Sequence, residues 1–205
     1  MNQNNLINYN FYYWGPLLFK TTIDDELCNS LLERGKNLKL NFRDNLAGHI
    51  EKELLYTEND KKFFVEKVYQ YFYEYTKTYE NYYDIKFNYI IELKNMWINF
   101  MKKYEDNPYH IHSEDLSFVI FLQIPEKLKK EYEEYHYHKG KGPGPGTIQF
   151  IYGQNEKNFI STHKFLPKEK EMFIFPANLM HQVYSFKSDC ERISVSGNLT
   201  LKEKI

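Results

Sequence analysis

Residues 110–122 read HIHSEDLSFVIFL. The apolar part of this segment, Leu116–Leu122, is rich in β-branched and aromatic residues and is typical of a buried strand. Residues two apart on an extended chain project from the same face, so His110, His112 and Glu114 would point together into one pocket. The segment therefore predicts a β-rich core with a group of metal-binding side chains at the mouth of one strand.

Several other segments in the second half of the chain have the same strand-like composition. Gly, Pro, Asn and Asp separate them, as a β-sandwich or barrel requires. The predicted strands are residues 87–93, 96–101, 116–124, 147–152, 172–175, 182–186 and 192–201.

The first part of the chain combines one strand with two helices. A strand is expected over 12–23, and Asp24 can cap a helix that runs to about Lys36. Thr57 and Asp60 form a capping-box-like start to a second helix. The apolar side chains of this second helix recur at spacings of three and four, which predicts one face packed on a sheet; they are Val65, Val68, Phe72, Tyr75 and Tyr79.

These patterns predict an α+β fold in a single domain of 205 residues. Residues 1–85 would supply the strand and the supporting helices, and residues 86–205 the β core. One face of an antiparallel sheet would be backed by helices, while its other face would enclose a pocket. A long loop is expected over 126–146, because it ends in the Gly- and Pro-rich run KGKGPGPG. Such a loop would be either a lid or a disordered excursion.

The overall composition argues against several classes of protein, namely nucleic-acid-binding, secreted and membrane-spanning proteins. The net charge of −1 gives no strong sign of nucleic-acid binding. The two cysteines, Cys28 and Cys190, lie far apart and favour a reducing compartment. No apolar run is long enough to span a membrane, and the first residues do not have the pattern of a signal peptide. We therefore expect a cytoplasmic protein with no membrane partner.

A second imidazole-bearing segment follows Phe175-Pro176. Pro176 would end a strand, and His181 would begin the next one, so that His181 could meet the first group. Two imidazoles and one carboxylate form the ligand set of a mononuclear non-haem Fe(II) site.

The last predicted strand has a polar face. Arg192, Ser194, Ser196 and Asn198 alternate with apolar or small residues and would share one side. If this side is interior, an unpaired arginine there is costly unless an anion meets it. Arg192 and Ser194 could then hold a carboxylate. The alternative is that this face is the solvent-exposed side of an edge strand.

Together these residues resemble a known family. The family is that of the 2-oxoglutarate- and Fe(II)-dependent oxygenases, in particular its prolyl-hydroxylase-like members. Its His-x-Asp/Glu element resembles His112-Ser113-Glu114, and its distal histidine resembles His181. Its Arg-x-Ser element resembles Arg192-Ile193-Ser194. Oxygenases found in bacteriophage and marine-microbial genomes are similar to this chain in several further segments, namely 97–99, 144–150, 175–177 and 191–198. The resemblance covers about residues 90–200 and implies a double-stranded β-helix core, also called jelly-roll or cupin-like, behind N-terminal helices.

The resemblance also implies a site and a reaction. Iron would be held by His112, Glu114 and His181, with His110 as an alternative first ligand and Asp115 as an alternative carboxylate. Arg192 and Ser194 would hold 2-oxoglutarate, with Asn99 and Asn198 as further co-substrate contacts. The reaction would consume O2, release succinate and CO2, and usually hydroxylate the substrate, with ascorbate as an optional reductant. The substrate is unidentified and could be a small molecule, a nucleotide or a protein side chain.

Two other functions compete with this interpretation. A cupin-type dioxygenase or isomerase would bind metal through His110, His112 and His181 and would not need 2-oxoglutarate. A non-enzymatic jelly-roll binding protein would keep the pocket without productive iron. His136 and His138 repeat the His-x-His spacing, but they lie in the predicted loop and are expected to be incidental or to face the substrate.

Overall fold

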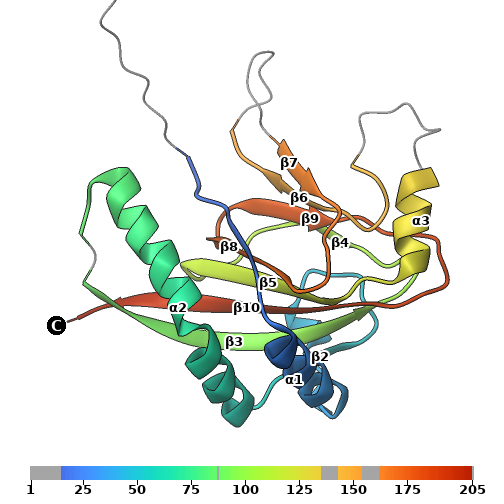
Figure 1. The fold of residues 1–205 in the computed structure, drawn as a ribbon, viewed down its shortest axis with the longest axis horizontal. Coiled ribbons are helices and arrows are strands. Elements are labelled where there is room, and N and C mark those ends of the chain that lie inside the picture. The colour runs from blue at the N-terminus through green and yellow to red at the C-terminus, as the bar shows by residue number, and fades with distance from the viewer. Residues whose placement is uncertain (1–14, 87, 135–142, 154–161, 205) are drawn as a thin grey trace, which may run out of the picture.

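Two antiparallel sheets face each other, and helices cover the outer side of the larger sheet (Figure 1). The computed structural model describes residues 15–86, 88–134, 143–153 and 162–204. The larger sheet has the strand order β1-β8-β5-β10-β3-β2, and the smaller sheet has the order β4-β9-β6-β7. The predicted α+β class is confirmed, as are the helix-backed sheet and the pocket on its inner side.

Every pairing within the two sheets is antiparallel. The strands of the larger sheet are β1 (Phe19–Thr22), β2 (Glu53–Leu55), β3 (Tyr89–Met101), β5 (Leu116–Gln123), β8 (Glu171–Pro176) and β10 (Arg192–Glu203). Those of the smaller sheet are β4 (Asn107–His110), β6 (Ile148–Ile151), β7 (Thr162–Phe165) and β9 (Met180–Val183).

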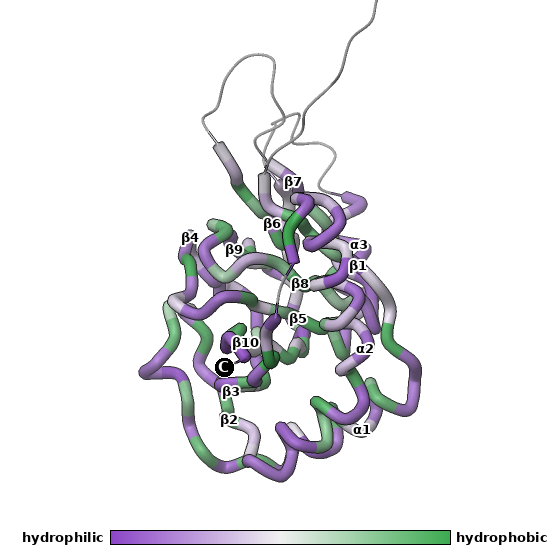
Figure 2. The backbone as a smooth tube through the Cα atoms, turned by 90° about the vertical axis from the view of Figure 1, so that its left-hand side faces the viewer, coloured by the Kyte–Doolittle hydropathy of each residue, from purple (hydrophilic) through white to green (hydrophobic). Residues whose placement is uncertain are grey.

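Both N-terminal helices begin where the sequence predicts. Asp24 caps α1 (Asp25–Lys36) by accepting a hydrogen bond of 2.7 Å from the backbone of Leu27. Thr57 and Asp60 form a reciprocal capping box at the start of α2 (Glu58–Tyr83). Figure 2 shows both helices on one side of the larger sheet. The buried side chains of α2 that pack there are Phe64, Val68, Phe72 and Tyr75.

Several predicted boundaries need correction. The first strand begins at Phe19, after Gly15 and Pro16, and residues 12–14 lie outside the described part. The predicted strands 87–93 and 96–101 are one strand, β3, because a shift of register opposite Asn198 and Leu199 accommodates the polar break between them. Strands β2, β4 and β7 were missed, because each is too short to show a period in the sequence.

The prediction of a loop over 126–146 was wrong in its first half. Residues 126–134 form helix α3 (Glu126–Glu134). The reason is that Leu128 is fully buried and fixes this otherwise charged segment to the core. The carboxylate of Glu131 also accepts hydrogen bonds from the backbone of Lys187 and Ser188. His136 and His138 lie outside the described residues.

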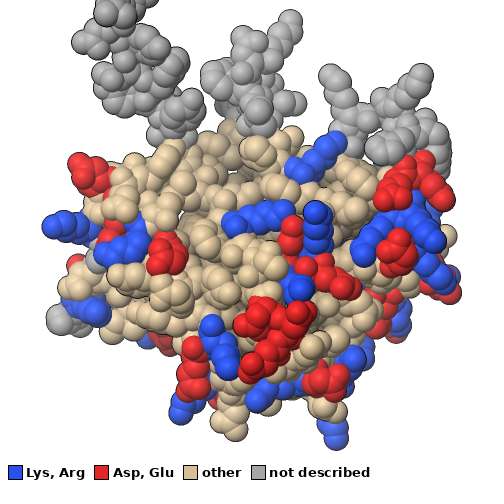
Figure 3. All heavy atoms as spheres, in the orientation of Figure 1, with Lys and Arg blue, Asp and Glu red and all other residues tan. Residues whose placement is uncertain are grey.

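The surface carries mixed charge. Lysine and arginine side chains are interspersed with acidic ones on the face shown in Figure 3, in keeping with the net charge of −1. Cys28 and Cys190 are both free thiols. Within the described ranges, no helix has the length and apolar character needed to cross a bilayer.

Candidate metal centre

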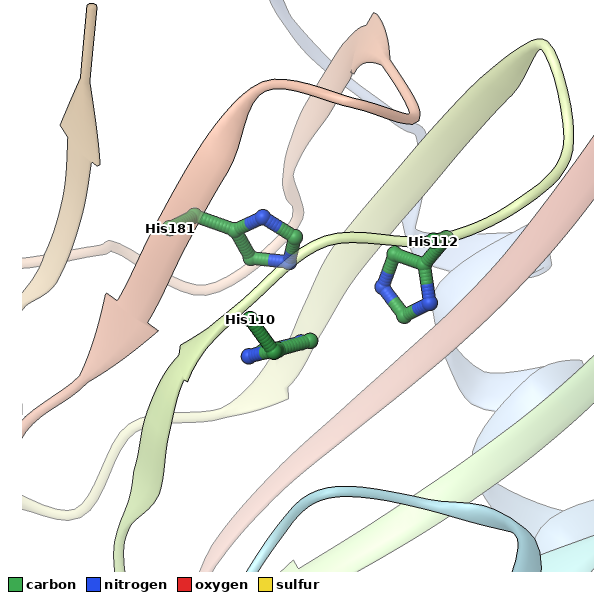
Figure 4. Close-up of side chains that lie close together, drawn as sticks. All are labelled: His110, His112 and His181. Carbon is green, nitrogen blue, oxygen red and sulfur yellow. The ribbon is translucent and has the colours of Figure 1, made fainter.

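Three histidines meet inside the fold, two from the smaller sheet and one from the segment that follows its strand β4. His110 ends β4 and is directly paired with His181 of β9, while His112 lies two residues beyond β4. Their possible ligand nitrogens all lie within 4.8 Å of one another. The centroid of the His110 ring lies 4.2 Å from the centroid of the His181 ring and 5.0 Å from that of the His112 ring. Figure 4 shows the three rings gathered around one point.

Local hydrogen bonds fix two of the three rings in the form that binds metal. Nδ1 of His110 lies 2.7 Å from the carbonyl oxygen of Pro108, and Nδ1 of His181 lies 2.8 Å from that of Leu179. A carbonyl can only accept, so Nδ1 carries the proton in both rings and the lone pair of Nε2 remains available.

Burial also keeps the three imidazoles neutral. Loss of solvent, and after it the neighbouring His110, lower the pKa of His181 to about 3. The same two causes lower the pKa of His112 to about 4, and burial lowers the pKa of His110. Near pH 7 the cluster is therefore ready to bind a metal ion without losing protons first.

The two carboxylates considered from the sequence lie outside this cluster. The chain bends over residues 113–115 instead of continuing as a strand. Asp115 is exposed, and its side chain accepts a 2.7 Å hydrogen bond from the backbone of Leu201. Glu114 accepts a hydrogen bond of 3.3 Å from Ser113. Among the described residues, the group of metal-binding side chains contains no carboxylate.

The inner face of β10 forms the opposite wall of the cavity. Arg192, Ser194, Ser196 and Asn198 all line it, whereas Ile193 and Val195 pack in the core beneath the helices. Arg192 is only 2% exposed, so this polar face is interior and not the outer side of an edge strand. The cavity is also lined by Ile50, Trp97, Asn99, Asn107, His110, His112, Ser117, Phe121, Ile148, Phe175, His181 and Val183.

Arg192 is a buried cation without an acidic partner in the described structure. Its Nη1 donates to the carbonyl oxygen of Gly146 at 3.1 Å, and its Nε has no hydrogen-bond partner there. Its guanidinium carbon lies 5.4 Å from the ring centroid of Phe121. Burial lowers the pKa of Arg192 to about 10, which still leaves it charged at neutral pH. A buried, unpaired guanidinium of this kind favours the binding of an anion.

Asn99 organises the serines beside Arg192. Trp97 donates from Nε1 to Oδ1 of Asn99 at 3.0 Å, which fixes the orientation of the amide because an indole can only donate. Nδ2 of Asn99 then donates to the hydroxyl oxygens of Ser194 and Ser196, each at 3.3 Å. Since both serines accept at their oxygens, their own hydroxyl hydrogens remain free to donate to a bound anion. Asn198 is held separately, accepting from Ser117 at 2.8 Å.

Two further polar residues carry no sequence signal. Asn107 lines the cavity from β4, and Glu53 is buried on β2, opposite the cavity residue Asn99 of β3. The reason is that both lie in short strands without a periodic pattern.

This donor set fits Fe(II) and a dicarboxylate. Three neutral imidazoles suit a first-row transition metal such as iron. The buried Arg192 and the two serine hydroxyls supply donors for an anionic co-substrate on the facing wall.

A family model described as "Putative 2OG-Fe(II) oxygenase" matches residues 95–198. The chain belongs to this oxygenase family. The expected class of enzyme is confirmed, and with it the use of Fe(II), 2-oxoglutarate and O2. No curated protein sequence gives a significant match.

Solved structures with a similar fold are oxygenases from diverse sources. A viral collagen prolyl hydroxylase from Paramecium bursaria Chlorella virus 1, complexed with 2-oxoglutarate, has a TM-score of 0.57 at 12% identity, covering 90% of this chain and 96% of that one. HygX from Streptomyces hygroscopicus, with nickel and 2-oxoglutarate bound, has a TM-score of 0.56 at 8% identity, with coverage of 91% and 82%. A prolyl-4-hydroxylase from Pseudomonas putida has a TM-score of 0.53 at 10% identity, with coverage of 88% and 90%. These likenesses confirm the expected double-stranded β-helix fold.

Proposed function

We propose that this oxygenase binds iron through His110, His112 and His181, and 2-oxoglutarate through Arg192 and Ser194, to oxidise a substrate carbon. The observation that carries the proposal is the convergence of three neutral imidazoles, one buried and two half-buried, opposite a buried arginine that has no acidic partner in the described structure.

The three-histidine set differs from the His-x-Asp/Glu arrangement that the sequence suggested. In this assignment His110 and His112 take the two positions of the first motif, and His181 supplies the third ligand. Glu114 and Asp115 have no place in it, because the bend over 113–115 turns the chain away. Neutral ligands leave the full charge of the ion in place, which favours a dianionic co-substrate at the same site.

Each residue of the site has a distinct role in this proposal. When bound, Fe(II) and 2-oxoglutarate supply the oxidising chemistry, in which O2 is consumed and succinate and CO2 are released. The Nδ1 hydrogen bonds of His110 and His181 hold the rings in position. Arg192 and the hydroxyls positioned by Asn99 hold the distal carboxylate of the co-substrate. The apolar side chains of Phe121, Ile148 and Val183 exclude water.

An anaerobic titration with Fe(II) and 2-oxoglutarate tests the proposal through the visible charge-transfer band of the chelate. We expect the band in the wild type, its loss in His181→Ala, and a much weaker band in Arg192→Ala at the same 2-oxoglutarate concentration. The matched controls are His163→Ala and Arg43→Ala, which remove an exposed histidine and an exposed arginine that do not line the cavity. The absence of a band in the metal-loaded wild type would contradict the proposal.

The alternative considered from the sequence, a cupin-type three-histidine dioxygenase or isomerase without 2-oxoglutarate, could use the same metal site, but it gives the buried Arg192 no role and does not agree with the family match. Arg192 separates the two, because only the proposed function needs it. A charge-reversing Arg192→Glu should abolish turnover in the oxygenase that uses 2-oxoglutarate and have less effect in the alternative.

The proposed function does not fix the class of substrate. A small molecule, a nucleotide or a protein side chain would each be compatible with it. A cytoplasmic location belongs to the same proposal and is supported by the two free thiols.

A further inference from the structure

A second pocket, which we call the outer pocket, opens beside the metal site. Its apolar side is formed by Phe42, Leu46 and Ile111, and its polar side includes Asn95, Glu114 and Asn198. His112 and Asn198 line both the outer pocket and the cavity that contains the three histidines. Ile111 is 56% exposed, so the outer pocket is open to solvent. Its volume of about 470 Å³ lies in the range of small-molecule sites, about 300–1,000 Å³. The outer pocket is therefore an approach from the surface to a proposed iron ligand.

Asn198 presents a hydrogen-bond donor at the junction of the two spaces. It is only 4% exposed, and its Oδ1 accepts from the hydroxyl of Ser117 at 2.8 Å. Its Nδ2 donates to no residue that the structure describes, and unlike Nε of Arg192 it is not fully enclosed by protein. A donor in a nearly buried side chain that lacks an acceptor costs free energy. Asn198 therefore favours a ligand that brings an acceptor into this junction.

This donor lies far from the arginine that is proposed to hold 2-oxoglutarate. Asn198 follows Arg192 by six residues on β10, which is about 20 Å of strand at about 3.3 Å per residue. A five-carbon dicarboxylate whose far end is held at Arg192 cannot extend along the whole of that distance. Asn198 is therefore better placed to contact a substrate that approaches the metal through the outer pocket.

The charged side chains in the approach to His112 all have one sign. Glu114 lines the outer pocket, and Glu114 and Asp115 line a neighbouring pocket that also reaches His112. Among the described residues, no lysine or arginine lines either pocket, although the chain has 27 lysines and arginines against 28 acidic residues. Arg43, beside Phe42 in the sequence, lies close enough to the buried Glu53 to lower its pKa and does not line the outer pocket. Such a surface attracts a cation and disfavours a phosphate or a carboxylate.

Glu114 is accessible to a ligand. Its side chain is half-buried, and its one hydrogen bond within the described ranges comes from the hydroxyl of the exposed Ser113 at 3.3 Å. The bend over 113–115 separates this carboxylate from the group of three histidines. The acidic residue that the sequence suggested as an iron ligand thus lines the approach to the metal, where it can meet a positive charge.

We propose that the substrate enters through the outer pocket and carries an ammonium group that binds the Glu114 carboxylate, while Asn198 donates to an acceptor of the substrate closer to the metal. The inference rests on the proposed function, because the outer pocket leads to the proposed oxygenase site. It makes the substrate a protonated amine that also bears a hydrogen-bond acceptor, and it argues against a substrate recognised through phosphate groups.

Three probes test the sign of the charge that the pocket selects. All have a primary carboxamide, whose carbonyl can accept from Asn198, at one end of a chain of similar length. At the other end ε-aminocaproamide is a cation, heptanamide is neutral and adipamate is an anion.

Four variants test the residues that the proposal names. Glu114→Gln keeps the shape of the side chain and removes its charge. Glu66→Gln is the matched control, because Glu66 is an exposed residue of α2 that lines neither pocket. Asn45→Trp narrows the outer pocket from an exposed position, so this variant should fold. Asn198→Leu removes the donor and keeps a side chain of similar size.

Calorimetry on protein loaded anaerobically with Fe(II) and 2-oxoglutarate measures the affinity for each probe. We expect the wild type and Glu66→Gln to bind ε-aminocaproamide about tenfold or more tightly than heptanamide, and adipamate most weakly, because hydrogen bonds between charged groups are the stronger ones. Glu114→Gln should lose this order, and Asn45→Trp should weaken the binding of all three probes. Asn198→Leu should weaken all three by about threefold, the effect of one neutral hydrogen bond, without changing their order.

Equal or undetectable binding of the three probes by the wild type, or an unchanged order in Glu114→Gln, would overturn the proposal. Undiminished binding in Asn45→Trp would overturn the location of the pocket. The chelate band, read in the same samples, separates these results from failure of the iron site, which would remove the band from the wild type. A band lost in Glu114→Gln alone would place this carboxylate on the metal and overturn its assignment to the substrate.

Discussion

His110 and His181 lie directly opposite each other on β4 and β9, with their ring centroids 4.2 Å apart. The pairing of two strands thus brings together imidazoles that are far apart in the sequence. His112 joins them from the segment after β4, where the backbone of His112 donates to the carbonyl of Ala177 at 2.8 Å. The metal site is therefore held by backbone hydrogen bonds, between β4 and β9 in the smaller sheet and to the residue that follows β8 of the larger sheet, which makes it rigid.

Metal binding should stabilise the fold and depend on each histidine. An ion at one hundred times its dissociation constant adds about 2.7 kcal/mol to the free energy of unfolding. We expect this gain, measured by urea unfolding with and without Fe(II) under anaerobic conditions, to vanish in His110→Ala, His112→Ala and His181→Ala. Glu114→Ala should keep the full gain. A loss of the gain in Glu114→Ala would show that a carboxylate takes part.

Arg192 should control the affinity for 2-oxoglutarate and leave metal affinity unchanged. Truncating one partner of a buried, hydrogen-bonded charge pair costs about 2–5 kcal/mol. Arg192→Gln should therefore weaken 2-oxoglutarate binding by about thirtyfold or more, measured by anaerobic calorimetry. Arg43→Gln, an exposed arginine outside the cavity, provides the control. Equal 2-oxoglutarate affinity in Arg192→Gln and the wild type would refute this role.

Asn99 should act through the serines that it positions. Asn99→Leu removes the amide that donates to Ser194 and Ser196 while keeping a side chain of similar size. A typical hydrogen bond contributes about 0.5–1.5 kcal/mol, so we expect the KM for 2-oxoglutarate to rise about three- to tenfold. Ser194→Ala should have a comparable effect. An unchanged KM in Asn99→Leu would count against the positioning role.

Glu53 should make the metal-free protein less stable as the pH rises. Burial raises its pKa from 4.5 to about 7 in the folded state, so the folded protein holds a proton that the unfolded chain has lost. The stabilising contribution is complete below about pH 4.5 and is lost as the pH rises through 7. Compared with wild type, Glu53→Gln should therefore gain relative stability between these values in urea unfolding. Parallel pH profiles of the two proteins would disprove the shift.

Gly197 should tolerate no side chain, because β10 is closely packed on its helix side. A Cβ there would lie 2.6 Å from the backbone oxygen of Asn95 and 2.6 Å from the ring of Phe118. Overpacking typically costs about 1–3 kcal/mol, so Gly197→Ala should unfold at a clearly lower urea concentration. Gly48→Ala, where the nearest atoms are at 3.5 Å, is the matched control and should be close to wild type. Equal stability of the two variants would contradict the packing described.

Strong local signals made much of the fold predictable from the sequence. The capping box of Thr57 and Asp60 fixes the start of α2, and the strict alternation from Arg192 to Asn198 indicates that the polar residues share one face, although only the structure shows that this face is interior. Helix α3 was not predictable in this way. Its charged segment is held to the core by the buried side chain of Leu128, and one apolar residue does not produce a helical period in the sequence. Glu53 lies in a strand of three residues, so nothing local indicated that it would be buried.

The site was predictable up to the point where the backbone changes direction. The expectation that Glu114 shares a face with His110 and His112 assumed that the strand continues beyond His112. Instead, the backbone of Asp115 donates to the carbonyl of Leu199 and accepts from Ala177, which turns the chain. These long-range contacts depend on residues far away in the sequence, so local spacing alone could not indicate them.

A crystal structure of the protein loaded anaerobically with Fe(II) and 2-oxoglutarate, with the metal located by anomalous scattering at the iron edge, tests the central claim most directly. We predict iron bound to the imidazoles of His110, His112 and His181 with no protein carboxylate, and the distal carboxylate of 2-oxoglutarate on Arg192. Iron bound to Glu114 or Asp115, with one of the three histidines displaced, would contradict it.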